Sequence, residues 1–214
     1  NAITREEIRE YLNPVYDLER LITRVTYQTA NPRDLIAFRN SIHMLPPIKT
    51  LMSDFQSPLL KRLYEQLDTL DELYELIEHS ITEEPPLTLH DGGILKEGYN
   101  EEVDRLRKAK TDGKSWLADL EAKEREKTGI KNLKIKYNKV FGYYLEVTKS
   151  FIDQVPEDWM RKQTLVNAER YTTPKLKELE ETITGAEDKL YTLEYNVFCE
   201  VRDAIYAQIG RIQT

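Results

Sequence analysis

A regular apolar stripe near the carboxyl end places the strongest limit on the fold. Apolar residues recur there in alternating steps of three and four: Leu176, Leu179, Ile183, Ala186, Leu190, Leu193 and Val197. This spacing over three heptads is typical of a long helix that packs against another helix along a narrow seam. We predict that this helix begins at Pro174, is capped by Thr173, and exposes residues off the stripe, such as Glu180.

A second long helix is expected from about residue 97 to residue 127. Its seam is heptad-like with a polar middle: Tyr99, Val103, Leu106, Lys110, Gly113, Leu117 and Leu120. Two narrow seams in one chain predict two long helices packed against each other as a coiled coil.

Between the two helices, apolar residues recur at every second position instead of at every third or fourth. Leu133, Ile135 and Tyr137 alternate with lysines, and a second alternating run contains Tyr143, Leu145 and Val147. Residues 138–142 connect the runs, so we predict a β-hairpin. Residues 163–170 are expected to supply a third strand.

The first 80 residues indicate short packed helices. Asn31-Pro32 and Ser57-Pro58 each place a capping residue before a proline at the first helical position. The predicted fold class is mainly α with a small β tip: a helical core bundle, two long antiparallel coiled-coil helices, and a small antiparallel sheet inserted between them. We expect a helical core part at 1–95, and arms at 96–214 that carry the sheet at about 130–173.

The strand-rich segment is basic on an acidic chain. Residues 131–177 hold ten Lys or Arg and five Asp or Glu, a charge of +5, whereas the whole chain is −7 and the remainder therefore −12. Such an island favours a polyanionic partner, although a solvated strand face is the alternative. Lys and Arg neutralise phosphates, and Asn and Gln hydrogen-bond them without reading sequence. The candidate contacts are Lys134, Lys136, Asn138, Lys139, Arg161, Lys162 and Gln163, with Tyr137 and Tyr144 left open as base-stacking residues.

Other chemistry has little support. Gly113-Lys114-Ser115 matches the end of a phosphate-binding loop, but Lys108 stands where that motif needs its first glycine. The three histidines show no metal-ligand spacing, and the single cysteine, Cys199, excludes an internal disulfide. We expect no catalytic, metal or cofactor site. No apolar run approaches the ~20 residues of a membrane span. No signal peptide is recognised before the fold, so we expect a cytoplasmic setting.

Several ordered strings of residues recur together along the chain. They begin with the run from Asp17 to Leu21, the run from Asn31 to Leu35, and Asp91-Gly92-Gly93-Ile94. Further along they include Tyr137-Asn138 and Gly142-Tyr143-Tyr144, and the most specific run extends from Met160 to Tyr171. In this order the strings resemble the MutS family of DNA mismatch-repair proteins in bacteria, and the resemblance is collinear over essentially the whole chain.

The resemblance implies a core or lever domain with a clamp domain inserted in it. In that family two clamps of a homodimer cross over duplex DNA and touch its backbone, and an ATPase reached through the lever helices controls opening. The candidate residues above would lie in or near the DNA-facing tip. ATP, Mg²⁺ and a MutL-like partner are expected for the longer parent protein, in the bacterial cytoplasm near the nucleoid. This chain carries no ATPase motif, so we expect it to have no enzymatic activity.

Two rival functions remain open. The first is a structural coiled-coil adaptor whose basic tip binds an acidic protein. The second is an enzyme with a carboxylate site at the Asp91 loop, which no convergent base or metal cluster supports.

Overall fold

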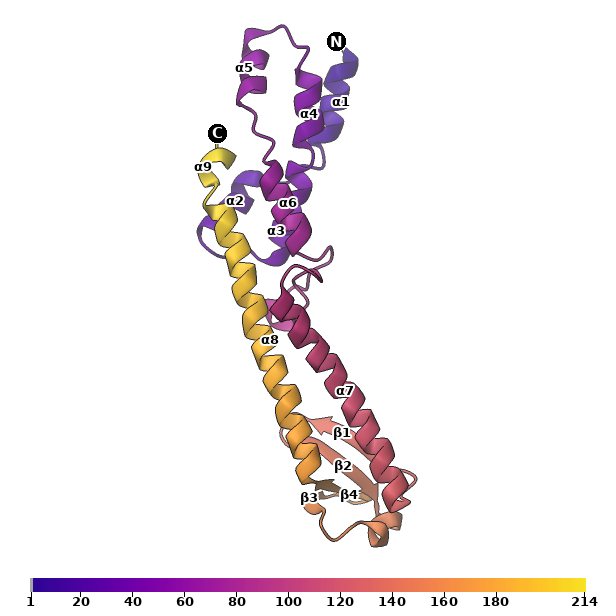
Figure 1. Cartoon of the computed structure of the whole chain (residues 1–214). Coiled ribbons are helices and arrows are strands. Elements are labelled where there is room, and N and C mark those ends of the chain that lie inside the picture. Colours follow the sequence, from indigo (N-terminus) through magenta and orange to yellow (C-terminus); the bar gives the residue numbers. More distant parts are fainter. Residues whose placement is uncertain (1) are drawn as a thin grey trace. The chain divides into compact units, whose positions relative to one another are not determined.

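The computed structural model describes residues 2–214 and forms two compact units. Unit 1 comprises the chain up to Asn100 together with Tyr191–Thr214, and unit 2 comprises Glu101–Leu190. Figure 1 shows the elements of both units along the chain. The expected domain boundary between residues 95 and 96 stays a prediction.

Unit 1 is helical and has its own apolar core. Its elements are α1 (Ala2–Leu12), α2 (Leu18–Thr26), α3 (Pro32–Ile42), α4 (Leu45–Met52), α5 (Pro58–Gln66), α6 (Asp71–Ser80), η1 (Leu89–Asp91), the end of α8 (Pro174–Tyr206) and α9 (Ile209–Ile212). Fully buried side chains include Leu35, Phe38, Ile42, Ile77 and Phe198. Asn31 caps α3 with a reciprocal bond to Asp34, as predicted, whereas the Ser57 side chain makes no capping hydrogen bond to α5.

A buried carboxylate joins the loop before α7 to the last part of α8 within unit 1. Glu194 is 2% exposed, and its oxygens accept three backbone N–H groups, from Gly93 at 3.1 Å, Ile94 at 2.7 Å and Leu95 at 3.0 Å. Gly92 and Gly93 have φ angles of +68° and +70°, a region that favours glycine. The two glycines therefore turn the loop so that consecutive N–H groups face one side chain.

Replacing Glu194 tests this contact. We expect Glu194→Ala to lower the free energy of unfolding by several kcal/mol, since each buried N–H left without an acceptor costs about 1–3 kcal/mol. The exposed Glu200 on the same helix is the control, and Glu200→Ala should stay within about 0.5 kcal/mol. Urea unfolding of both variants measures the difference, and equal losses would show that the loop does not depend on the carboxylate.

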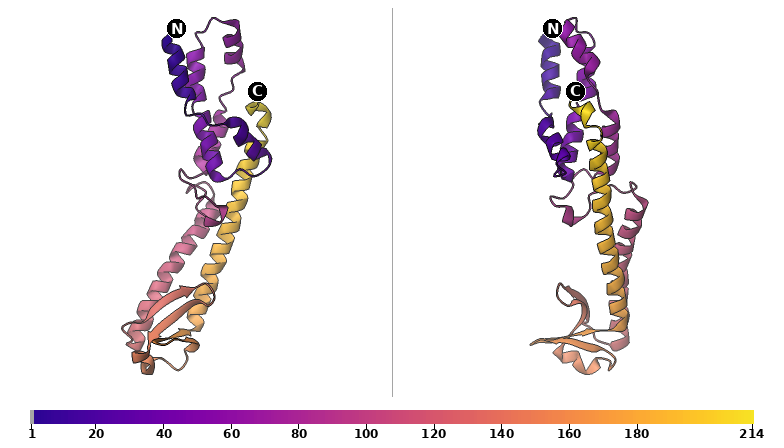
Figure 2. Two further views of the ribbon diagram at one scale, coloured as in Figure 1. Left: turned by 180° about the vertical axis from the view of Figure 1, so that it is seen from behind. Right: turned by 90° about the vertical axis from the view of Figure 1, so that its left-hand side faces the viewer.

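Unit 2 is a helix pair with a four-stranded antiparallel sheet. It contains α7 (Glu101–Thr128), β1 (Lys134–Asn138), β2 (Gly142–Thr148), η2 (Lys149–Gln154), β3 (Met160–Thr164), β4 (Ala168–Thr172) and the first part of α8. The strand order is β1-β2-β4-β3. The sheet lies to one side of the two helices (Figure 2). The predicted class, mainly α with a small β tip, is confirmed, and so is the hairpin over residues 133–147.

One face of the sheet packs against α7 and α8. The shared core contains Leu117, Leu120, Ile130, Leu133, Leu145, Val147, Trp159, Tyr171, Leu176, Leu179 and Ile183. The predicted cap of α8 is also present, because the Leu176 N–H donates to Thr173 Oγ1 at 3.2 Å. Along β1, Glu121 on α7 accepts the Ile135 N–H at 2.9 Å, which satisfies a backbone group at the sheet edge.

Gly113 explains how the predicted seams meet. A β-carbon at Gly113 would lie 2.5 Å from Cγ1 of Ile183, closer than real side chains approach. Val103, Leu106, Gly113, Leu117 and Leu120 are the buried residues of α7, as the heptad spacing predicts, whereas Tyr99, also expected on the seam, precedes the helix and is exposed. The glycine in the polar middle of the seam therefore allows α7 and α8 to approach closely inside unit 2.

Two predictions for unit 2 are wrong in detail. The segment 163–170 is not a third strand, because β3 and β4 form a second hairpin whose turn lies at residues 165–167. β3 has a polar sequence, so a search for alternating apolar residues does not detect this strand. Glu180 is half-buried rather than exposed, and it accepts the Tyr143 N–H at 3.2 Å. Gly142 leaves the space for it, since a β-carbon there would overlap the Glu180 carboxylate.

Alanine substitution at two helical glycines tests the close approach. Gly185→Ala should raise stability by about 0.5–1 kcal/mol, since alanine favours a helix and nothing lies within 4 Å of the new methyl group. Gly113→Ala gains the same helix preference but forces Ile183 aside, so we expect a lower melting temperature.

A double-mutant cycle separates the clash from other effects. Adding Gly113→Ala to Ile183→Ala should cost less than adding it to the wild type, because the contacting atom is gone. If Gly113→Ala stabilised the protein as much as Gly185→Ala, the helices would not meet at this point.

Candidate nucleic-acid interface

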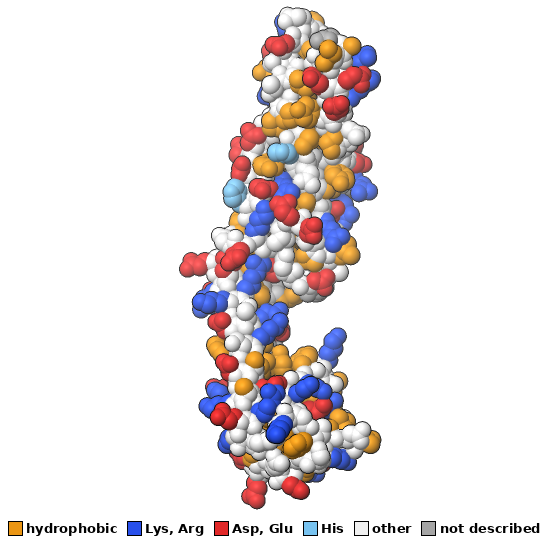
Figure 3. Space-filling model, turned by 90° about the vertical axis from the view of Figure 1, so that its right-hand side faces the viewer, with side chains coloured by type: hydrophobic (Ala, Val, Ile, Leu, Met, Phe, Trp, Pro, Cys, Tyr) orange, Lys and Arg blue, Asp and Glu red, His pale blue; other side chains and the backbone are white. Residues whose placement is uncertain are grey.

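The outer face of the sheet, which we define by Lys134, Lys136, Tyr144, Glu146, Gln163 and Arg170, brings charged residues from three strands together. Side chains alternate between the faces of a strand, so burial of Leu133, Leu145 and Val147 sends their neighbours to the other side. In the strand register Lys134 is paired with Glu146, Lys136 with Tyr144, and Glu146 with Arg170. Figure 3 shows several Lys and Arg side chains, with Asp and Glu among them, on the surface of unit 2.

Glu146 lies at the centre of this face between cations from both neighbouring strands. Lys136 Nζ donates to Glu146 Oε1 at 2.7 Å, and Arg170 Nε donates to Glu146 Oε2 at 3.3 Å. The hydrogen bond from Lys136, followed by the charges of Lys136 and Arg170, holds the pKa of the Glu146 carboxyl below its usual value of 4.5. The carboxylate is therefore engaged on both of its oxygens.

Arg170 orders the middle of the outer face. Its guanidinium lies 4.3 Å from the ring centre of Tyr144 and donates to Gln163 Oε1 at 2.8 Å. Tyr144 is only 4% exposed, so its ring is covered and cannot stack on a base. Tyr137 is exposed at 59%, and its ring contacts that of Tyr143 at 4.9 Å between centroids.

The turn between β1 and β2 adds a second group of candidates. Asn138 Oδ1 accepts the N–H groups of Val140 at 2.8 Å and Phe141 at 3.4 Å, which fixes the turn and leaves the Asn138 NH₂ group pointing away from these bonds. Lys162 Nζ donates to the Phe141 carbonyl at 2.8 Å. Lys162 lies in the bulge of β3, and its side chain therefore contacts the same turn that carries Lys139.

Arg161 lies apart from the other candidates. It is paired with Tyr171 in the register, on the face that contributes to the core, and it contacts Glu169 at 3.2 Å. Glu169 is buried and accepts the Tyr171 hydroxyl at 2.6 Å. The structure therefore brings together six of the seven predicted residues, on the outer face or at the turn: Lys134, Lys136, Gln163, Asn138, Lys139 and Lys162.

The lysines differ in what already binds them. Within residues 2–214, Lys134 and Lys139 make no ion pair and no side-chain hydrogen bond, and both are exposed. In contrast, Lys136 pairs with Glu146, and Lys162 donates to the Phe141 carbonyl. Glu146 and Arg170 were not among the predicted contact residues. The period of two in β2 already placed Glu146 on the face of Lys134 and Lys136, but Arg170 required the position of β4.

No competing site emerges from the described part of the chain. No group of three or more His, Cys, Asp or Glu could hold a metal ion, and no helix in the described chain is both long and apolar enough to cross a membrane. Gly113-Lys114-Ser115 lies inside α7 rather than in a loop after a strand, as expected. The His90 side chain lies outside the described residues.

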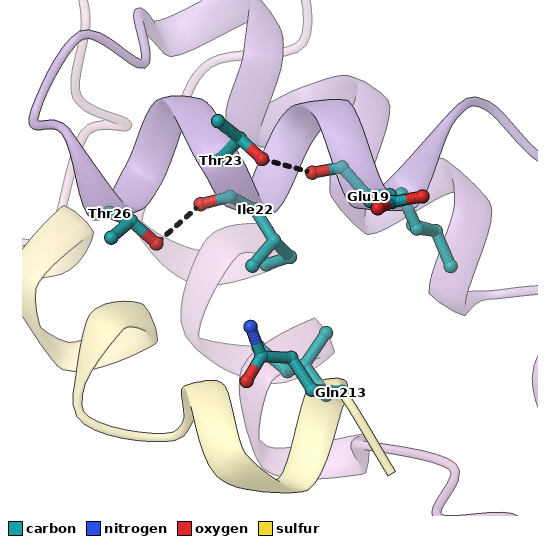
Figure 4. Close-up of a pocket in the computed structure, with 7 residues that line it drawn as sticks. Glu19, Ile22, Thr23, Thr26 and Gln213 are labelled. Atoms are coloured by element: carbon teal, nitrogen blue, oxygen red, sulfur yellow. Dashed lines mark hydrogen bonds between the residues drawn. The ribbon is translucent and has the colours of Figure 1, made fainter.

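A cavity of about 520 Å³ in unit 1 also lacks reactive groups. It is lined from α2 and α9 by Leu18, Glu19, Ile22, Thr23, Thr26, Ile212 and Gln213 (Figure 4). The hydroxyls of Thr23 and Thr26 donate to carbonyls of their own helix, at 2.8 and 2.9 Å. Glu19 is then its one titratable lining residue, so nothing converges there for catalysis.

The Glu146 network predicts a specific dependence of stability on pH. Because the folded-state pKa of Glu146 is lowered, its contribution is fully present above about pH 4.5 and is lost as pH falls through the lower folded value. Glu146→Gln removes that dependence. We expect the melting temperature of the variant to fall less than that of the wild type between about pH 6 and about pH 3. Parallel curves would show that the contacts with Lys136 and Arg170 do not persist in solution.

Comparison with known proteins gives concordant matches. Residues 98–189 match the family model described as MutS family domain IV. The chain is 64% identical over 213 residues to the DNA mismatch repair protein MutS of Lachnoclostridium phytofermentans, covering 100% of this chain and 23% of that protein. It is 60% identical over 213 residues to that of Caldanaerobacter subterraneus subsp. tengcongensis, covering 100% of this chain and 24% of that protein.

A third relative extends the same pattern. The MutS protein of Acetivibrio thermocellus is 56% identical over 210 residues, covering 98% of this chain and 24% of that protein. The chain thus spans about a quarter of the length of the curated relatives it matches. Together with the domain match, these identities show that the chain belongs to the bacterial MutS family.

Proposed function

We propose that the sheet of unit 2 is a clamp that holds the backbone of duplex DNA without reading its sequence. The observation that carries this proposal is the placement of six candidate residues on one sheet face and its adjoining turn, with Lys134 and Lys139 exposed and unpaired in the described chain. Such ammonium groups neutralise phosphates and release the counterions condensed on DNA.

The chemistry of this face favours phosphates over bases. Lysine presents a compact charge on a flexible stem, which suits phosphate oxygens and carries little sequence information. The Asn138 and Gln163 carbonyl oxygens are both used internally, by the turn and by Arg170. A base edge read by an amide needs its oxygen as well as its NH₂ group, so these side chains are suited to donate to phosphate only.

The proposal extends to the longer parent protein. There α7 and the first part of α8 would act as a lever, because helices packed tightly at Gly113 and Ile183 move as one body. The lever would couple the clamp to an ATPase that uses ATP and Mg²⁺ elsewhere in the parent. Two such clamps in a homodimer would enclose the DNA, and a MutL-like protein would respond, in the bacterial cytoplasm near the nucleoid. For the present chain we propose DNA contact without ATPase activity.

Single neutralised lysines test the clamp. We expect Lys134→Gln and Lys139→Gln each to weaken binding to a labelled duplex and to reduce the slope of log K against log[salt] by about 0.9. Lys61→Gln on α5 removes the same charge outside the sheet and should leave the slope unchanged. Fluorescence anisotropy over a salt series, on matched and mismatched duplexes, gives both quantities.

The outcomes separate the rival functions. Equal loss on matched and mismatched duplexes supports a sequence-independent grip. A change confined to the mismatched duplex would make the sheet a reader of DNA instead. If an acidic polypeptide bound more tightly than DNA and the binding depended on Lys134, the adaptor function would replace the clamp.

A further inference from the structure

The outer face of the sheet contains an acidic residue, Glu146, between its cations. Glu146 is surrounded by Lys134, its register partner on β1, by Lys136 at 2.7 Å, and by Arg170 from β4 at 3.3 Å. Its side chain is 20% exposed, so the carboxylate lies in the surface rather than in the core. A protein selected only for tight DNA contact has no evident need for an anion between its cations.

The geometry of the contacts resembles that of a bound phosphate. Two oxygens of one anion accept from Lys136 Nζ and from Arg170 Nε, which come from opposite sides of β2. A DNA phosphate also offers two non-bridging oxygens to such a pair of donors. Glu146 therefore occupies the position in which one phosphate would engage two cations.

The remaining contacts hold this arrangement ready. Arg170 is also held by the Tyr144 ring, whose centre lies 4.3 Å from the guanidinium, and by Gln163 Oε1 at 2.8 Å. Its side chain is 18% exposed, so its position is fixed by the sheet and not by Glu146 alone. If the Glu146 side chain carried no charge, Arg170 would keep its contacts with Tyr144 and Gln163, and its positive charge would no longer be balanced by a neighbouring carboxylate.

We propose that Glu146 is an internal counter-ion that limits how strongly the clamp grips DNA, by competing with phosphate for Lys136 and Arg170. This inference rests on the proposed function of the sheet and specifies its regulation. With Glu146 ionised, DNA engages the exposed Lys134 and Lys139 fully, and engages the inner pair only by displacing the carboxylate. A weak, salt-sensitive grip is what a clamp needs in order to move along DNA, since non-specific contacts of this kind allow sliding.

Glu146→Gln tests the proposal because glutamine keeps the size of the side chain and removes its charge. Released cations should add phosphate contacts, each steepening the salt slope by about 0.9, which at about 0.1 M salt corresponds to about 8-fold tighter binding for one cation and about 60-fold for two. Glu146→Asp keeps the charge and should bind as the wild type does.

Glu102→Gln is the matched control. Glu102 also pairs with an arginine, Arg105, in the same unit, and its removal changes the net charge by the same amount. It lies at the start of α7, about 40 Å along the helix from the end that leads into the sheet. If Glu102→Gln tightened binding as much as Glu146→Gln, the effect would be one of net charge, and the proposal would be wrong.

The same assay distinguishes failure of this inference from failure of the clamp. If Lys134→Gln and Lys139→Gln weaken DNA binding while Glu146→Gln leaves it unchanged, the clamp stands and Glu146 only fixes the strand register. If the lysine variants have no effect in either background, the clamp itself fails.

A second variant keeps the proposal testable should Glu146→Gln fold poorly in a circular-dichroism melt. Glu146→Thr also removes the charge and suits a strand position, so it should tighten DNA binding and steepen the salt slope in the same direction as Glu146→Gln. Unchanged DNA binding by a folded Glu146→Thr would overturn the proposal.

Discussion

The packing of one sheet face against α7 and α8 is the constraint on which the rest of unit 2 depends. Leu133, Leu145, Val147 and Tyr171 are buried there with Leu176 and Leu179 of α8. Because strand side chains alternate, this burial fixes which residues form the opposite face. A slip of the β1–β2 register by one residue would send Lys134 and Lys136 into the core and expose Ile135. The apolar core thus determines the position of the charges that we propose bind DNA.

The charges on the outer face form a graded set rather than a uniform basic patch. Lys134 and Lys139 are exposed and unpaired among the described residues, Lys136 and Arg170 share Glu146, and Lys162 is bound to the turn carbonyl of Phe141. The pair of Glu146 and Arg170 is largely covered, with side chains 20% and 18% exposed, so it both adds stability while Glu146 is ionised and opposes an incoming anion. The proposed grip would then be set by how many of these cations a phosphate can reach.

Most of the fold follows from periodicity, and the misses have physical reasons. The seams of α7 and α8, the β1–β2 hairpin and the Thr173 cap were predictable, since each rests on a repeat or a local signal that buries apolar residues. The β3 strand was not, because Met160–Thr164 is polar and its place depends on pairing with β4. Glu180 was expected to be exposed, but its burial depends on the space left by Gly142 across the unit. The place of Arg170 in the site could not be predicted, because it depends on the pairing of β4 with β2.

The central claim is that DNA contacts the outer face of the sheet and the β1–β2 turn. Titration of duplex DNA into the isotope-labelled chain, followed by amide and Arg side-chain chemical shifts, tests it most directly. The account predicts that the largest shifts fall on β1, on residues 138–142 and on Arg170, while the seam residues Leu117 and Ile183 stay unchanged. Shifts concentrated on α1–α6 with an undisturbed sheet would contradict it.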